Sequence, residues 1–391
     1  MFILFVMGHG YLNQSWNGGS SMIHTTSNTV NELIVMLEQL DDSRRSRGKR
    51  HQLSFAVIIV LFATMSGYFG YRGIEDFINK HRMDLIAIFH PHKKRVPSFS
   101  TIRRILIALS FDDFVSIYRQ WLTKVQALSG QLNWMGMDGK TLCGTVSSEA
   151  DDEAVHLVSI FASFDYIPVD MAKVNDKSNE IPLVQQMIRD TKLRDVIFTL
   201  DALHCQKQTV KEIIDSHNDY VIAVKENQPK LLRQIKTNIE EGNPIDIDYT
   251  LEKNRGRIEE RSVFVYNNID NIDPEWKGLQ QIIQVDRITN HIRSEKITSQ
   301  TQYYISSLNE NAQNLNRGIR GHWGVENRLH WVKDVVFKED ASRIKIGNAP
   351  QNISLIKSWV ITIIQKNKKK SITKTIRNVA NDFKKMFKLL E

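Results

Sequence analysis

Three side chains suited to acid–base or metal chemistry recur every four residues near the C-terminus. They are His322, Glu326 and His330, and they lie in a stretch without proline from residue 320 to residue 343. We predict a helix from about residue 323, in which residues four apart share one face. One interpretation is a buried helix whose polar groups are satisfied by its neighbours. The other is a helix that delivers Glu326 into a charged active site.

Two aspartates are the candidate partners of Glu326. Residues 134–138 and 196–201 each read as a short apolar strand that ends in a carboxylate, Asp138 in the first and Asp201 in the second. If these strands are neighbours in a sheet, the two carboxylates lie side by side and Glu326 completes a cluster of three. Each aspartate alone is equally well explained as an ordinary carboxylate at the end of a strand.

Three clustered carboxylates favour divalent cations, because like charges at short range raise one another's pKa. Oxygen ligands suit Mg²⁺ or Mn²⁺. Two such ions about 4 Å apart activate a nucleophile and stabilise the leaving oxygen in phosphodiester chemistry. We therefore predict two ions held by Asp138, Asp201 and Glu326. The alternative is a transition-metal enzyme that uses Glu326 and its flanking histidines, but it lacks the usual His-Glu-x-x-His spacing and leaves both aspartates unexplained.

Positive charge is clustered in the sequence. The chain of 391 residues has 52 Lys and Arg against 44 Asp and Glu, and a net charge of +8. Residues 44–50 hold five cations, and residues 366–391 hold nine cations with two acids. Clustered cations suggest a polyanionic partner, since each neutralised phosphate releases counterions. The alternative for the C-terminal cluster is a solvated tail without a partner.

An uncharged run from Leu53 to Tyr71 is long enough to be a membrane-span candidate. Glycine, serine and threonine dilute the run, and no second run of this kind exists, so we prefer a buried core helix to a single-span membrane protein. The two cysteines, Cys143 and Cys205, are too few for a disulfide scaffold. A cytoplasmic protein without a membrane partner is therefore expected.

The order of the predicted elements divides the chain into four segments. Residues 1–27 are expected to be a disordered leader, residues 28–128 to be helical, and residues 366–391 to be a basic tail. Residues 129–365 are predicted to form a mixed α/β sheet with flanking helices, with a β-rich insertion at about 243–316. The strands are expected at 134–138, 154–166, 168–174, 196–201, 220–224, 258–266, 281–289 and 296–305, and further helices at 181–192, 206–216, 229–241 and 350–365.

Six motifs carry a resemblance to a known family. They are MDGKTLCGT (137–145), TLDALHCQKQT (199–209), DYVIAVKENQ (219–228), RGRIEERSV (255–263), YYISSL (303–308) and HWGVENRLHWVKDVVFKEDASRIKIGNAPQN (322–352). In this order they resemble the ISAs1 family of bacterial insertion-sequence transposases, which overlaps the H-repeat-associated proteins. The resemblance runs from about residue 28 to about residue 365, and its last motif is long and specific.

The resemblance implies a DDE transposase with an RNase H-like core, preceded by a helical transposase-associated domain. Asp138, Asp201 and Glu326 match the three catalytic carboxylates. The implied activity is metal-dependent DNA strand cleavage and strand transfer at the ends of an insertion sequence. The implied partners are double-stranded DNA, as terminal inverted repeats and as target, and further copies of the chain in the DNA complex. Nucleoid association in a bacterial cytoplasm follows. An inactive relative that only binds DNA is the alternative.

The resemblance also indicates DNA-contacting residues and departures from the family. Lys333 matches a basic residue that follows the catalytic glutamate in the related IS4 group, whereas His322 replaces an arginine of that group. Cys143 stands where the family usually has arginine, and Glu226 where it often has glycine. Arg261, near the first strand of the insertion, is a further candidate. The predicted DNA-binding residues are Lys333, Lys140, His322, His330, Arg255, Arg257 and Arg320.

The expected helix of Glu326 also carries two tryptophans, Trp323 and Trp331. We predict that Trp323, Trp331 or both are buried and anchor the helix of Glu326 on the sheet, since a carboxylate that reaches metals must be held firmly. We also predict that the basic tail acts as a general phosphate clamp on DNA.

Overall fold

The computed structural model describes residues 28–44, 49–125, 133–145, 154–175, 180–254, 256–292, 294, 296–367, 371–380 and 382–390. The expected leader, residues 1–27, and the candidate Arg255 lie outside these residues.

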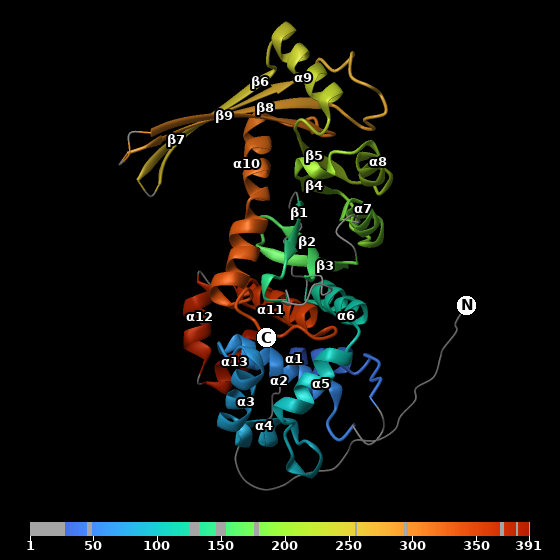
Figure 1. The fold of residues 1–391 in the computed structure, drawn as a ribbon, viewed down its shortest axis with the longest axis vertical. Coiled ribbons are helices and arrows are strands. Elements are labelled where there is room, and N and C mark those ends of the chain that lie inside the picture. The colour runs from blue at the N-terminus through green and yellow to red at the C-terminus, as the bar shows by residue number, and fades with distance from the viewer. Residues whose placement is uncertain are drawn as a thin grey trace, which may run out of the picture.

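One mixed sheet of nine strands forms the centre of the α/β fold, in the order β3-β2-β1-β4-β5-β9-β8-β7-β6 (Figure 1). The pairs β1–β4 and β4–β5 are parallel, and every other neighbouring pair is antiparallel. The strands are β1 (Asn133–Thr141), β2 (His156–Ala162), β3 (Ile167–Val174), β4 (Val196–Leu200), β5 (Asp219–Val224), β6 (Asp246–Asn254), β7 (Arg257–Tyr266), β8 (Gln281–His291) and β9 (Lys296–Ser306).

The β-rich segment extends this sheet. The last strand of the segment, β9, pairs with β5 in antiparallel orientation, so β6 to β9 continue the sheet outward from β5. Figure 1 shows these four strands as a long curved layer at the end of the molecule opposite to the N-terminal helices. The sheet is therefore continuous from the expected catalytic strands into the insertion.

The central strands are buried on both faces, as their uninterrupted apolar sequences predict. Every residue of β4 is buried. Alternate residues of β1 and β4 face opposite layers: Trp134 and Ile197 pack with α10, whereas Met135 and Phe198 pack in the layer of α7 and α8. The helices of this part are α7 (Glu180–Asp190), α8 (Lys207–Asp215), α9 (Pro229–Glu241) and α10 (Ala312–His322), with short 3₁₀ turns η3 (Cys143–Thr145) and η5 (Ala202–His204).

The helix that carries Glu326 begins earlier than expected. It starts with α10 at Ala312, and not near residue 323, and continues as two π-helical segments, η6 (Val325–His330) and η7 (Val332–Val336). The Trp331 amide donates to the Glu326 carbonyl, and the Phe337 amide to the Val332 carbonyl, each five residues back. Such π-helical turns are rare and are frequently found at functional sites.

The N-terminal helices share one core with the C-terminal helices. All thirteen residues of α2 are buried, which fits the core helix expected from the uncharged run. Among the described residues no single helix is long and apolar enough to cross a membrane, and only α2 and α3 together reach that length, with a bend of 98° between them. These helices are α1 (Asn28–Leu37), α2 (Leu53–Met65), α3 (Gly70–Lys80), α4 (Arg82–Phe89), η2 (His92–Lys94), α5 (Phe99–Ala108), α6 (Phe111–Lys124) and α11 (Ala349–Lys366).

The C-terminal basic segment is helical where the structure describes it. It forms α12 (Ile372–Val379) and α13 (Phe383–Leu390). The Phe383 ring lies 5.4 Å from the Phe62 ring of α2. The apolar face of each helix is buried and the cations lie on the opposite face. The expected tail therefore forms amphipathic helices. Its apolar residues recur at helical spacing and join the core, and the lysines between them stay exposed.

Candidate active site

The parallel pairing of β1 and β4 brings the two aspartates to one edge of the sheet. The register pairs Gly136 of β1 with Thr199 of β4. Two residues further on come Asp138, within β1, and Asp201, which directly follows the end of β4. Neighbouring strands lie about 4.8 Å apart, so the backbones that carry the two carboxylates are adjacent. This is the arrangement expected from the sequence.

Two glycines allow the helix of Glu326 to lie directly on these strands. A β-carbon on Gly318 of α10 would come within 2.1 Å of the Trp134 ring, and one on Gly136 of β1 would come within 2.5 Å of Val325. Any side chain at either position would push α10 or η6 away from the sheet. Because Glu326 follows Val325, this close approach sets how far Glu326 stands from Asp138.

His322 lies among the carboxylates and is fixed by the sheet. Its Nδ1 is 3.1 Å from the Thr199 hydroxyl. Burial lowers the pKa of its imidazole, while the charges of Asp138 and Asp201 act in the opposite direction. The influence of both aspartates on one ring indicates that His322 lies near both of them.

Asp138 and Glu326 interact with each other and with His330. The His330 Nδ1 is 3.4 Å from Asp138 Oδ2. The pKa of Glu326 is raised, mainly by partial desolvation and to a smaller extent by the charge of Asp138, whereas His330 acts to lower it. The His330 Nε2 is buried and has no hydrogen-bond partner among the described residues. His330 therefore lies beside Asp138, at the edge of the candidate site.

An open hollow of about 180 Å³ adjoins these residues. It is lined from β4 and its following turn by Thr199 and Asp201, and from the helix by His322 and Glu326. The side chains of Asp201 and Glu326 are exposed. A large substrate therefore has access to both carboxylates.

Asp201 is the first member of a chain of polar side chains in contact with one another, which was not predicted from the sequence. Its Oδ1 accepts a hydrogen bond from the Leu203 amide and lies 3.9 Å from His204 Nε2. His204 is 2% exposed, and the same nitrogen is 3.3 Å from Glu180, whose other oxygen accepts from His156 at 2.8 Å. His204 and Thr199 both belong to the motif TLDALHCQKQT (199–209), which was the available signal, but Glu180 had none.

The expectation that a tryptophan anchors the helix is wrong. Trp323 is 41% exposed and Trp331 is 54% exposed. The helix is held instead by three aliphatic side chains, Val325, Leu329 and Val332, which are at most 7% exposed. For Trp331 the error has a physical cause: the π-helical hydrogen bonds of η6 and η7 rotate the faces of the helix relative to the α-helical period used for the expectation.

Two lysines expected at the DNA lie in a buried charge cluster. Lys333 is 2% exposed, and its ammonium group donates to the Ser354 hydroxyl at 3.1 Å. Burial lowers its pKa to about 8. Lys140 is bonded to Asp334 and lies 3.7 Å from Glu339. In this structure both ammonium groups serve to join β1, η7 and α11.

Three arginines considered for DNA contact, Arg257 and Arg261 of the insertion and Arg320 of α10, occupy different environments. Arg257 is exposed. Arg320 makes a two-point ion pair with Glu252 of β6, at 2.6 and 2.8 Å. Arg261 is buried and donates to Asn316 of α10 at 2.7 Å, so it joins β7 to α10. Of these three arginines, Arg257 is therefore the one that is exposed and, within the described part of the chain, makes neither an ion pair nor a hydrogen bond of this kind.

The donor chemistry of the site suits a hard divalent cation. Asp201 and Glu326 line the same hollow, and the charge of Asp138 raises the pKa of Glu326, a repulsion of the kind that a cation relieves. Among the described residues, however, no group of three His, Cys, Asp or Glu side chains stands in an arrangement that holds a metal ion. This applies also to the set of His322, Glu326 and His330.

Two family profiles match the chain. The Transposase DDE domain matches residues 148–363, more than half of the chain, and the DDE_Tnp_1-associated domain matches residues 34–122. The first range includes Asp201 and Glu326 and begins after Asp138. The two ranges fall respectively on the part with the sheet and on the N-terminal helices.

Several curated relatives are similar over nearly their whole length. “Putative protein YbfL” of Escherichia coli (strain K12) is 30% identical over 364 residues, which cover 90% of this chain and 96% of that protein. “H repeat-associated putative transposase YhhI” of the same strain is 29% identical over 364 residues, with the same coverage. The resemblance to H-repeat-associated proteins is therefore confirmed. Among solved structures, a piggyBac transposase chain from a synaptic complex with hairpin DNA aligns with 93% of this chain and 77% of its own length, with a TM-score of 0.41 and 12% identity.

Proposed function

Because this chain belongs to the family of DDE-domain transposases, we propose that it cleaves DNA strands at the ends of an insertion sequence and transfers them to target DNA. Asp138, Asp201 and Glu326 are its catalytic carboxylates, on an RNase H-like core. The observation that carries the proposal is the register of β1 and β4, which sets Asp138 beside Asp201 under the helix of Glu326.

The same three carboxylates are the ligands we propose for Mg²⁺ or Mn²⁺, in a site for two ions. Bound there, such ions supply Lewis-acid stabilisation of the phosphate and a more acidic nucleophile. In the structure His330 lies beside Asp138, and the Asp201 carboxylate accepts a hydrogen bond from the Leu203 amide. The proposal therefore includes small side-chain rearrangements when metal and DNA bind.

The remaining residues of the site position the carboxylates. Thr199 fixes the His322 ring, which lies near both aspartates. His204 and Glu180 hold the turn that follows Asp201. Val325 and Leu329 fix the height of Glu326 above the sheet. The open hollow leaves room for a phosphodiester between Asp201 and Glu326.

Double-stranded DNA, as transposon end and as target, is the proposed substrate and partner, with more than one copy of the chain in the complex. His322 and His330 border the carboxylates, and Arg257 is an exposed cation on the insertion. For Arg320, Lys140 and Lys333, contact with DNA requires that their present partners in the protein be released.

The decisive experiment compares cleavage with binding in Glu326→Gln. This change removes one carboxylate charge and nearly preserves the size of the side chain. We expect loss of strand cleavage with Mg²⁺ or Mn²⁺ and retained binding to the transposon-end duplex. Glu240→Gln, at an exposed position on α9, is the matched control and should cleave like wild type.

Each other outcome has a clear meaning. Equal cleavage by Glu326→Gln and wild type excludes Glu326 from the catalytic set. Binding of the end sequence without cleavage by the wild-type chain, under all metal conditions, identifies a DNA-binding relative that has lost catalysis.

A further inference from the structure

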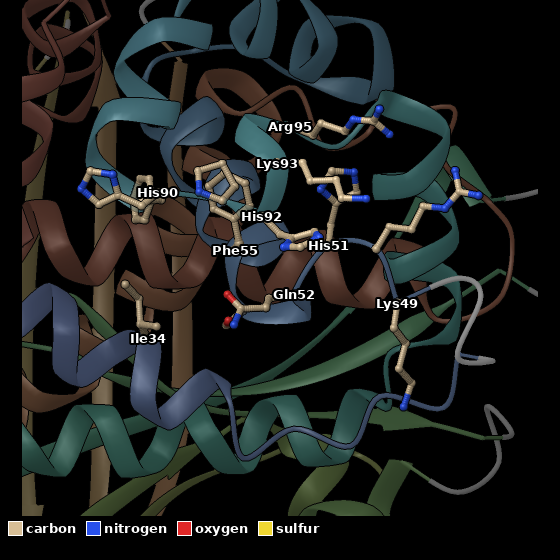
Figure 2. A pocket seen from close by; sticks show the side chains of 13 residues that line it. Ile34, Lys49, His51, Gln52, Phe55, His90, His92, Lys93 and Arg95 are labelled. Carbon is tan, nitrogen blue, oxygen red and sulfur yellow. The ribbon is translucent and has the colours of Figure 1, made fainter. Parts of the chain in front are cut away.

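A strongly basic hollow lies in the helical part of the molecule and shares no lining residue with the hollow at the carboxylates (Figure 2). Its volume is about 990 Å³. It forms where the chain enters α2 and where α4 gives way to the loop before residue 96. Figure 2 shows Lys49 and His51 on the first segment and His92, Lys93 and Arg95 on the second, around one space. Two segments distant in sequence thus bring their cations together.

The lining of this basic hollow carries one sign of charge. Four of its thirteen lining residues are permanent cations, Lys49, Arg50, Lys93 and Arg95, and three more are histidines. No Asp or Glu is among them. Side chains of one sign around a concave surface focus the electrostatic potential and raise the local concentration of counter-ions.

None of these four cations forms an ion pair with a carboxylate among the residues that the structure describes, although Lys49, besides Arg44, helps to lower the pKa of Asp42. Within the described ranges of the chain, no carboxylate lies within 4 Å of the charged groups of Lys49, Arg50, Lys93 or Arg95. The neighbouring Arg44 differs, because it is paired with Asp42 at 2.7 Å and also donates to the His51 carbonyl. Arg44 therefore holds the backbone at the hollow, and the four cations of the lining remain available to an anion.

The start of α2 adds positive polarity to the same space. Gln52 is the residue before this 13-residue helix, and its side chain makes no capping hydrogen bond. Gln52, Ser54 and Phe55 all line the hollow. The first amides of a helix lack partners within the helix and carry partial positive charge, so this helix end reinforces the potential set by the side chains.

The backbone beside the hollow is held in an uncommon conformation. His90 and Lys93 have positive φ angles of 43° and 54°, in the left-handed region that residues other than glycine seldom adopt. Such strain persists where the surrounding structure or a function requires it. Here it turns the loop so that the Lys93 and Arg95 side chains reach the same space as His51 (Figure 2).

We propose that this basic hollow binds backbone phosphates of duplex DNA, as a second contact surface in addition to the carboxylate site. The cations are exposed and span a wide, open concavity, which suits a polymer of phosphates better than one enclosed anion. The choice of DNA as the polyanion rests on the proposed transposase function, whereas the charge arrangement stands on the structure. The contact is to phosphates, so it adds affinity without reading sequence.

The test compares two triple variants with equal loss of charge. The hollow variant is Lys49→Gln, Arg50→Gln, Arg95→Gln. The control is Arg189→Gln, Lys211→Gln, Lys277→Gln, whose cations already pair with carboxylates at the surface. Binding of a fluorescein-labelled duplex of random sequence is followed by fluorescence anisotropy across a range of KCl concentrations. Melting temperatures of both variants establish that they are folded.

We expect the hollow variant to bind DNA about tenfold more weakly or worse near physiological salt, with a salt slope that falls by about 0.9 for each phosphate that the protein no longer neutralises. The control should keep the wild-type affinity and slope. An unchanged affinity and slope in the hollow variant overturns the inference and leaves the proposed function standing. Failure of the wild-type chain to bind any duplex overturns both.

A second measurement on the wild-type chain avoids the risk of misfolded variants. Lysine acetylation is quantified by mass spectrometry with and without the duplex. Lys49 and Lys93 should be protected by the duplex, while Lys211 on α8 should not. Protection by sodium pyrophosphate but not by the duplex identifies a site for small phosphate compounds and overturns the assignment to DNA.

Discussion

Gly136 of β1 lies directly under Val325 of η6, so closely that a β-carbon on the glycine would come within 2.5 Å of Val325 Cγ2. This contact links the strand of Asp138 to the helix of Glu326, since each carboxylate is within two residues of it. The spacing of two proposed catalytic groups is therefore set by the absence of one side chain.

Gly136→Ala should accordingly impair both stability and cleavage. Forcing a methyl group into this packed contact should cost about 1–3 kcal/mol of unfolding free energy and displace Glu326 from the sheet. Urea unfolding and a strand-cleavage assay measure the two effects. The double variant with Val325→Ala removes the opposing methyl groups and should recover cleavage relative to Gly136→Ala alone. No recovery would show that the contact does not set the position of Glu326.

Truncation to alanine should lower the unfolding free energy far less at exposed Trp331 than at buried Leu329 of η6. Trp331→Ala should change the unfolding free energy by only about 0.5 kcal/mol, as at other surface positions. Leu329→Ala, at a fully buried position, should cost about 2–5 kcal/mol. Thermal or urea unfolding of the two variants makes the comparison. A larger loss from Trp331→Ala would restore the tryptophan as the anchor.

The sequence was sufficient for the strands around the site and insufficient for the helix above it. β4 and β5 are short, apolar and buried, so their composition revealed them, and Asp201 follows the end of β4 as expected. Asp138 was expected at the end of its strand but lies within β1, which continues to Thr141 by pairing with β2. β6 was missed because its apolar residues, such as Tyr249 and Leu251, are exposed and alternate with acidic residues. The burial of Lys333 was not predictable, since the cluster around it joins segments far apart in the chain.

The helix of Glu326 shows a different limit. Its α-helical period places His322, Glu326 and His330 on one face, and the structure does bring all three to the site. The same period gave the wrong orientation for Trp331. The backbone amides of Trp331 and Phe337 donate to carbonyls five residues earlier in the chain, and not four as in an α-helix. Local amino-acid patterns do not report such a change of helical type, which depends on how the segment packs on β1.

Removal of the C-terminal helices should unfold part of the molecule. Deletion after Lys366 takes away the buried side chains of α12 and α13, among them Ile376, Phe383 and Met386, and exposes α2. We expect a lower melting temperature and aggregation. The expectation of a phosphate clamp needs a different variant, in which exposed Lys374, Lys384 and Lys388 are changed to Gln.

That lysine variant should fold normally and bind all duplexes more weakly, with a reduced salt slope. Fluorescence anisotropy with two unrelated duplexes checks this. If affinity and slope stay at the wild-type values while the fold is intact, the exposed cations of α12 and α13 do not contact DNA.

The final prediction concerns the buried carboxylate of Glu339, which is 4% exposed. Its oxygens lie 3.3 Å from Lys357 and 3.7 Å from Lys140. Burial by itself acts to raise the pKa of Glu339, but Lys357, Lys333 and Lys140 outweigh it and lower the pKa from 4.5 to about 2. A carboxyl group with a lower pKa in the folded state stabilises the fold above its unfolded pKa. This contribution is complete above about pH 4.5 and is lost as the pH falls towards 2.

Glu339→Gln should therefore be costly at neutral pH and less so in acid. At pH 7 the change leaves Lys357 buried without its partner, which should cost about 3–5 kcal/mol. As the pH falls through this window, the wild-type chain loses the same interaction by protonation, so the difference in unfolding free energy between the two proteins should shrink. Urea unfolding from neutral to acidic pH measures it, with exposed Glu240→Gln as the control. A difference that stays constant with pH would mean that Glu339 is not ionised in the folded protein and that its lysine neighbours do not hold its charge.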